Sequence, residues 1–185
     1  MGLYKMCNMT KLLAVGFLVQ SIKRFGEYKL MADMAIKQLS EPQVFELPAE
    51  GSNSIAIIMH HMAGNMLSRW TNFLTEDGEK PWRDRDGEFD PVRMNLSALM
   101  AYWEKGWSCL LDTLNALTPE DLEKEIKIRG ESIAAFDAII RQLMHYSSHV
   151  GQIVFIAKMF KATDWQPLTI PKNQSKDYNE SMGYK

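Results

Sequence analysis

The stretch from Ser132 to Phe160 constrains the fold most, because it predicts one uninterrupted helix of about eight turns. It contains no Pro, and Gly151 is its only strongly helix-weakening residue. Ser132 follows Gly130 and precedes the apolar run, so it is the expected N-cap. Apolar residues recur at spacings of three and four, which indicates one buried helix face. The residues of this expected face are Phe136, Ile140, Leu143, Ser147, Val150 and Val154.

Two histidines lie four residues apart in this helix. Side chains at i and i+4 stack on one helix face with Cβ atoms roughly 5–6 Å apart, so His145 and His149 can bind one metal ion. The other two histidines of the chain, His60 and His61, lie in a second apolar helical stretch. The alternative is that all four are ordinary imidazoles satisfied by hydrogen bonds. A pair on one helix with a histidine on a second helix favours the metal site.

Three further amphipathic helices are expected, at about residues 17–39, 55–74 and 96–117. Pro42 ends the first, Asp77-Gly78 is the expected stop of the second, and Asn95 is the expected cap of the third. Only Ile126 to Ile128 alternates apolar and charged residues, so that run is expected to be extended. Four long helices without a strong strand pattern predict an all-α four-helix bundle.

The connection from Glu79 to Pro91 is long enough for a crossover between the second and third helices. It is either a solvated loop anchored by two aromatics, Trp82 and Phe89, or a loop that covers a functional site. Its acidic residues, Asp84, Asp86 and Glu88, are of unknown exposure, and no residue of the sequence stands out as a general base.

We expect three parts: an N-terminal extension at residues 1–15, either helical or disordered, the bundle at 16–170 and a polar C-terminal tail at 171–185 that frays at Ser181 to Lys185. A net charge of −2 gives no basic field for nucleic acid or an anionic membrane, and no apolar run has the length of a membrane span. The two cysteines, Cys7 and Cys109, form no framework, which fits a reducing cytoplasm. A cytoplasmic protein without nucleic-acid or membrane partners is therefore expected.

A helical bundle builds metal sites from inward side chains on facing helices. The second helix can supply His61 or His60, and the spacing favours His61, because it shares a stripe with Asn65. Three imidazoles on one divalent ion leave coordination positions open, as in catalytic sites. Asn65 and Gln152 are the candidates to hydrogen-bond the ligands from behind. Zn or Ni is favoured as the cofactor, with Fe, Co, Cu and Mn as alternatives.

Two motifs resemble the DinB-like superfamily of metal-binding four-helix bundles: SIAIIMHHMA at residues 54–63, and His145-x-x-x-His149-x-Gly151-Gln152-Ile153. The likeness covers about residues 15–160, and the second motif is the more specific. The family places one metal-binding histidine on the second helix, in a register that falls on His61, and its other two ligands match His145 and His149. The segments GNMLSRWTNFLTEDGEKPWRDRDGEF and WQPLTIPKNQS further resemble one uncharacterised branch, which looks bacterial and cytosolic.

Characterised members of that superfamily include transferases and isomerases that use low-molecular-weight thiols. The resemblance therefore implies a metal-dependent enzyme that activates a thiol or water, for thiol transfer or hydrolysis of a small-molecule substrate. The alternative is a non-catalytic metal-binding or stress-related module, and a plain bundle without metal is the third interpretation.

Two aromatic residues, Trp70 and Tyr102, lie off the main apolar stripes of their helices. Aromatic side chains left at a bundle surface are enriched in interfaces. A homodimer with two-fold symmetry is therefore a candidate assembly. The alternative is that the Glu79–Pro91 connection and the tail cover these aromatics.

Overall fold

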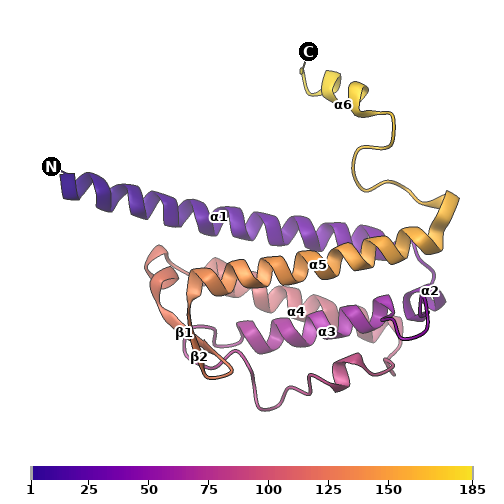
Figure 1. The fold of residues 1–185 in the computed structure, drawn as a ribbon, viewed down its shortest axis with the longest axis horizontal. Helices are drawn as coiled ribbons and strands as arrows, with labels where there is room; N and C mark the ends of the chain where they lie inside the picture. The colour runs from indigo at the N-terminus through magenta and orange to yellow at the C-terminus, as the bar shows by residue number, and fades with distance from the viewer. Residues whose placement is uncertain (1, 185) are drawn as a thin grey trace.

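The computed structural model describes residues 2–184, with the side chains of residues 11–184. Its four long helices are α1 (Gly2–Ile36), α3 (Ile55–Trp70), α4 (Leu96–Ala116) and α5 (Ala135–Lys161). They form a bundle in which α1 packs along α5 and α3 packs along α4 (Figure 1). The prediction of an all-α four-helix bundle with a long crossover between its second and third long helices is confirmed.

Short elements connect the long helices. The helix α2 (Glu41–Phe45) follows α1, the 3-10 turn η1 (Gly87–Phe89) lies in the crossover, and η2 (Pro119–Glu123) follows α4. An antiparallel hairpin, β1 (Glu125–Ile128) and β2 (Glu131–Ala134), then leads into α5. The 3-10 turn η3 (Ala162–Asp164) and the helix α6 (Ser175–Ser181) follow α5, and α6 stands apart from the bundle in Figure 1.

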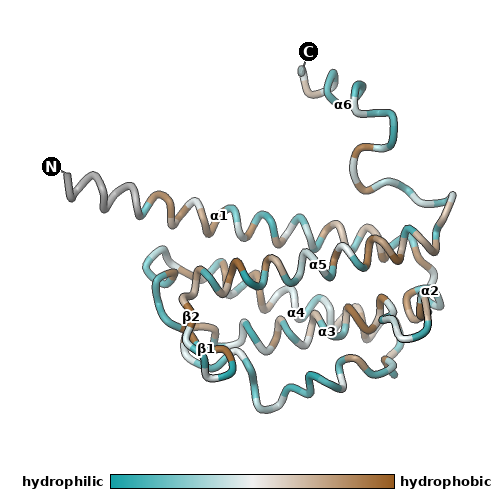
Figure 2. The backbone as a smooth tube through the Cα atoms, in the orientation of Figure 1, coloured by the Kyte–Doolittle hydropathy of each residue, from teal (hydrophilic) through white to brown (hydrophobic). Residues whose placement is uncertain are grey.

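The core is built from side chains of all four long helices, and apolar residues follow those helices in Figure 2. Side-chain caps start two of them: Ser54 accepts from the Ile57 N–H, and Asn95 accepts from the Ala98 N–H. Gly106 lets α3 and α4 approach closely, because a Cβ there would lie 2.9 Å from the Cα of Ala63.

The placement of Trp70 at the bundle surface is wrong. It is only 1% exposed, because its ring packs against Phe25 of α1 and Phe73 and its Nε1 donates to the Tyr146 hydroxyl of α5. Tyr102 is half-buried with its ring against His60. The exposed apolar side chains of the bundle lie elsewhere, on α1 and on the outer face of α5.

Two expectations about α5 are also wrong. The helix begins at Ala135, and Ser132 lies in β2 opposite Lys127, so Ser132 is not an N-cap. The buried face is offset by one residue from the expected one, and it leaves Phe136 and Ile140 exposed. Spacing marked Phe136 and Ile140, whereas Ala135, Ala138 and Ile139 are the buried residues of these turns. The buried residues are Ala135, Ala138, Ile139, Gln142, Tyr146, Val150, Ile153, Ile156 and Ala157.

Two helix boundaries differ from the sequence pattern. The helix α3 ends at Trp70 and not at Leu74, because Thr71 is extended and Asn72 adopts a left-handed backbone with φ of 52°. The helix α1 begins at Gly2, so residues 2–15 form a helical extension of the helix expected from about Phe17; no Pro interrupts them, and Gly16 lies within the helix.

The tail packs back onto the bundle through Trp165 and Leu168, whereas Ile170 is exposed. Two residues of the expected terminal segments lie outside the described part of the chain: Met1 of the extension at 1–15 and Lys185 of the segment expected to fray. Within residues 2–184, no helix combines the length and the apolar character needed to cross a membrane.

Candidate metal centre

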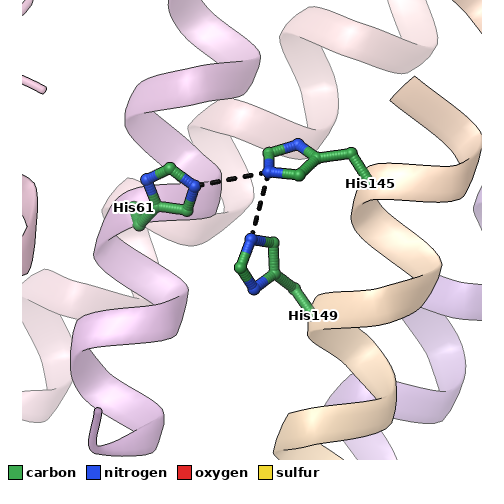
Figure 3. A group of neighbouring side chains, drawn as sticks. All are labelled: His61, His145 and His149. Atoms are coloured by element: carbon green, nitrogen blue, oxygen red, sulfur yellow. Dashed lines mark hydrogen bonds between the residues drawn. The ribbon is translucent and has the colours of Figure 1, made fainter. Parts of the chain in front are cut away.

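Three histidines converge between α3 and α5. His61 projects from α3, and His145 and His149 project from adjacent turns of α5 (Figure 3). The Nε2 atom of His145 lies 3.5 Å from Nε2 of His61 and 3.1 Å from Nε2 of His149. One ring nitrogen from each histidine lies within 4.8 Å of the other two. His60 lies outside this group and contacts Tyr102, with ring centroids 5.4 Å apart.

Glu88 of the crossover orients His61. The Nδ1 atom of His61 lies 2.9 Å from Oε2 of Glu88, and both side chains are buried. Burial alone would raise the pKa of this carboxyl, but hydrogen bonds from Arg83 and His61 outweigh burial and keep the pKa of Glu88 below its ordinary value. An ionised carboxylate only accepts, so His61 carries its proton on Nδ1 and presents the Nε2 lone pair to the cluster.

The crossover holds Glu88 firmly against α3. Arg83 forms a bidentate pair with the carboxylate, Nε donating to Oε1 at 2.8 Å and Nη2 to Oε2 at 2.7 Å. Gly64 provides the space, because a Cβ at that position would overlap the Glu88 carboxylate. The ring of Phe89 covers His61 at a centroid distance of 4.6 Å. The second expectation for this loop, that it covers a site, describes the structure.

Trp82 is not the anchor that the sequence suggested, because its side chain is 59% exposed. The charged residues Lys80 and Glu88 are buried in its place, each with an ion-pair partner. Charge pairing therefore fixes this loop together with one aromatic ring.

The two candidate supporting residues lie in different places. Gln152 contacts the cluster, since its Oε1 lies 2.8 Å from Nδ1 of His149. An amide oxygen accepts, so His149 also presents Nε2 to the cluster as a lone pair. Asn65 lines the cavity beside the histidines, and its Oδ1 accepts from the Tyr146 hydroxyl at 2.9 Å. Trp70 donates to the same hydroxyl at 3.2 Å, which fixes Asn65 through a buried chain.

The imidazoles of α5 are held neutral. Burial is the main cause that lowers the pKa of His145 to about 3, and the neighbouring His149, His61 and arginine charges contribute to the same shift. Burial also lowers the pKa of His149, against the opposing hydrogen bond with Gln152. Neutral imidazole is the form that binds metal ions, so both residues are ready to act as ligands at pH 7.

The donor set fits a divalent metal ion. His61 and His149 both direct an Nε2 lone pair toward His145, whose own Nε2 carries at most one proton, so hydrogen bonds alone leave one nitrogen unsatisfied. A tetrahedral ion with metal–nitrogen distances of 2.0–2.1 Å holds its nitrogen ligands about 3.3 Å apart. The two separations from His145, 3.1 and 3.5 Å, bracket that value, and the third lies within 4.8 Å.

A cavity of about 340 Å³ opens beside the cluster. The three histidines, Asn65, Phe89 and Gln142 line it together with five arginines. A metal ion on the histidines would therefore face a space large enough for a small molecule.

Sequence reasoning found the histidines and missed the charged groups around them. Glu88 was grouped with two other loop carboxylates, although it alone of the three adjoins Phe89, the aromatic that packs inward. Arg141 precedes His145 by four residues and so shares its helix stripe. The position of Arg141 is a local signal that helical spacing provides, whereas the contact of Glu88 with His61 depends on the folded path of the loop.

The comparisons with known proteins bear on the fold and the family of this chain. Residues 13–174 match the model of a family described as a protein of unknown function, DUF1572. No curated protein gives a significant match. The crystal structure of YjoA, a DinB-like protein from Bacillus subtilis, superimposes with a TM-score of 0.52 and 18% sequence identity, covering 80% of this chain and 96% of that chain. At this identity the likeness shows the fold, which is DinB-like.

Proposed function

The chain belongs to the DUF1572 family, and we propose that it is a metal-dependent enzyme in which His61, His145 and His149 hold one divalent ion. One observation carries the proposal: three imidazole nitrogens converge within 4.8 Å at the wall of a cavity of about 340 Å³. Three protein ligands leave a coordination position open, as catalytic sites require. Zn or Ni is the favoured ion, and Fe, Co, Cu and Mn are alternatives.

Such an ion supplies Lewis acidity, which lowers the pKa of a water or thiol that coordinates it. The residues around it have separate tasks. Glu88 and Gln152 hold the protons on the Nδ1 atoms of His61 and His149 and so fix both rings. Phe89 shields His61 from solvent. The reaction proposed is transfer of a small thiol to an electrophile, or hydrolysis.

The alternative is a non-catalytic metal-binding or stress-related module. One observation favours it: Glu88, the carboxylate that contacts the histidines, is already engaged by Arg83 and His61 and is not free to act as a general base. A thiol that is ionised by the metal needs no separate base, so this observation weighs more against hydrolysis than against thiol transfer.

The test is an activity screen with metal-loaded protein purified in chelator-free buffer. Several bacterial low-molecular-weight thiols are offered with electrophiles, and activated esters and amides test hydrolysis. The proposal expects turnover that disappears in His145→Ala and persists in His60→Ala. Full metal occupancy without turnover on any substrate would leave the binding module as the better description.

We also propose a cytoplasmic homodimer. The support differs from the sequence-based reason, because Trp70 is buried. Exposed apolar side chains instead follow the outer face of α5 at helical spacing, where two copies can pack side by side about a two-fold axis. They are Phe136, Ile140, Met144, Phe155 and Met159.

A further inference from the structure

The cavity beside the histidines is strongly cationic. Its wall carries five arginines from four parts of the chain: Arg69, Arg83, Arg85, Arg129 and Arg141. Among the described residues, no Asp or Glu lines it. The whole chain has a net charge of −2, so the positive wall is a local concentration and not a reflection of composition.

Two buried or half-buried carboxylates stand behind this wall and neutralise part of it. Glu79 accepts from Arg69 and Arg129 at 3.1 Å each and lies 3.6 Å from Arg83. Glu88 accepts two hydrogen bonds from Arg83. The exposed Asp86 lies 3.6 Å from Arg85. Three carboxylates for five arginines still leave a surplus of positive charge at the cavity.

The arginine on the hairpin is held in place by its backbone. Arg129 occupies the β1–β2 turn with a left-handed φ of 56°. The Asp77 carboxylate accepts the backbone N–H of Arg129 at 2.8 Å and that of Gly130 at 2.7 Å. The hairpin lies outside the four long helices and places the Arg129 side chain at the cavity.

Arg141 is the arginine without a countercharge. It lies one helical turn before His145 on α5 and lines the same cavity. Within the described chain, no carboxylate forms an ion pair with it, whereas Arg69, Arg83 and Arg129 each have one. An unpaired guanidinium next to a histidine cluster offers two parallel N–H groups to an oxyanion.

We propose that this cavity binds a small acidic substrate, whose carboxylate or phosphate groups are held by Arg141 and Arg129 while its reactive end lies at the three histidines. This inference rests on the proposed function, because it takes the acidic molecule to be the substrate of the three-histidine metal site. It also explains the wall itself, because a divalent cation beside several guanidinium groups is repelled unless an anion enters with it. Cationic molecules are disfavoured by the same field.

The test is calorimetric titration of chelator-treated protein with succinate and, separately, with inorganic phosphate at low ionic strength. Binding of either anion at millimolar or tighter affinity is expected, and the tighter one identifies the acid group of the substrate. Arg141→Gln is expected to weaken binding about tenfold, because it removes one charged hydrogen-bonding group. Arg141→Lys keeps the charge but loses the two parallel N–H groups, so its anion affinity is expected to lie between those of wild type and Arg141→Gln.

Arg24→Gln on α1 is the matched control, because Arg24 is exposed, pairs with Glu27 and does not line the cavity. No binding of either anion, or equal binding by wild type and Arg141→Gln, would overturn the inference. The protein in this titration is metal-free, so the anion-binding result does not depend on whether the histidines bind a metal ion. Metal content measured on separate untreated samples reports the proposed function independently.

Discussion

Replacing Glu88 by Gln tests how the protein orients its metal-binding imidazoles. The carboxylate lies 2.9 Å from Nδ1 of His61 and also receives two N–H groups of Arg83. A single amide oxygen cannot serve all three donors, and it carries no charge. Losing a charge-assisted hydrogen bond costs about 1.5–3 kcal/mol, so we expect the dissociation constant for a divalent ion to rise about 10- to 100-fold.

The assay is competition between the protein and a chromogenic chelator for Zn or Co at pH 7.5. Asp86→Asn is the matched control, because that carboxylate lies two residues away with a side chain 99% exposed. The control is expected to bind as wild type does. Equal affinities for Glu88→Gln and Asp86→Asn would refute the claim that Glu88 orients His61.

A second route to the same carboxylate is Gly64→Ala. The added Cβ would overlap the Glu88 side chain and push it from His61, so metal affinity is expected to fall without any change at a polar residue. Gly151→Ala is its control, since a Cβ at that position meets nothing within 4 Å. A Gly64→Ala protein with unchanged affinity would show that Glu88 can shift and still support the site.

Three further outcomes are expected. The unfolding free energy of the metal-free protein should fall as pH drops from about 6.5 toward 3, by at most about 1.4 kcal/mol per pH unit. The reason is that His145 binds a proton in the unfolded chain over this range but not in the folded one, where its pKa is lowered to about 3. Denaturant titrations at several pH values should show a weaker dependence of this free energy on pH for His145→Gln. Gly106→Ala should destabilise the fold by about 1–3 kcal/mol in the same assay through overlap with Ala63, and a neutral effect would argue against the close helix approach. Light scattering should give the wild-type protein a mass of about twice the 21.3 kDa of one chain, and Phe155→Glu the mass of one chain. A wild-type mass equal to that of one chain would exclude the dimer.

Much of the fold follows from helical periodicity, because long apolar stripes leave few alternatives to a bundle. The buried face of α4 follows its large apolar side chains, which recur every four residues at Leu99, Trp103 and Trp107. The stripe of α5 was misplaced by one residue, because Ala138 packs inward while Phe136 is 44% exposed. The apolar stripe of a helix is predicted mainly from its large residues, whereas a face that packs closely against other helices can carry small ones such as Ala138.

The histidine cluster was accessible from spacing, but its surroundings were not. The i,i+4 relation of His145 and His149 is a local property of one helix, so the sequence displays it. Glu88 reaches His61 across 27 positions, through a loop whose path depends on Gly64 and Arg83. The same holds for the cationic wall, which the hairpin, the crossover and two helices assemble only in the folded chain.

Elemental analysis of purified variants tests the central claim most directly. The protein and four variants, His60→Ala, His61→Ala, His145→Ala and His149→Ala, are purified in chelator-free buffer and their metal content is measured per chain. The account predicts about one divalent ion in wild type and in His60→Ala, and sharp loss in the other three, because only those three imidazoles converge. Metal retained by His61→Ala, or no metal in folded wild-type protein after loading, would contradict it.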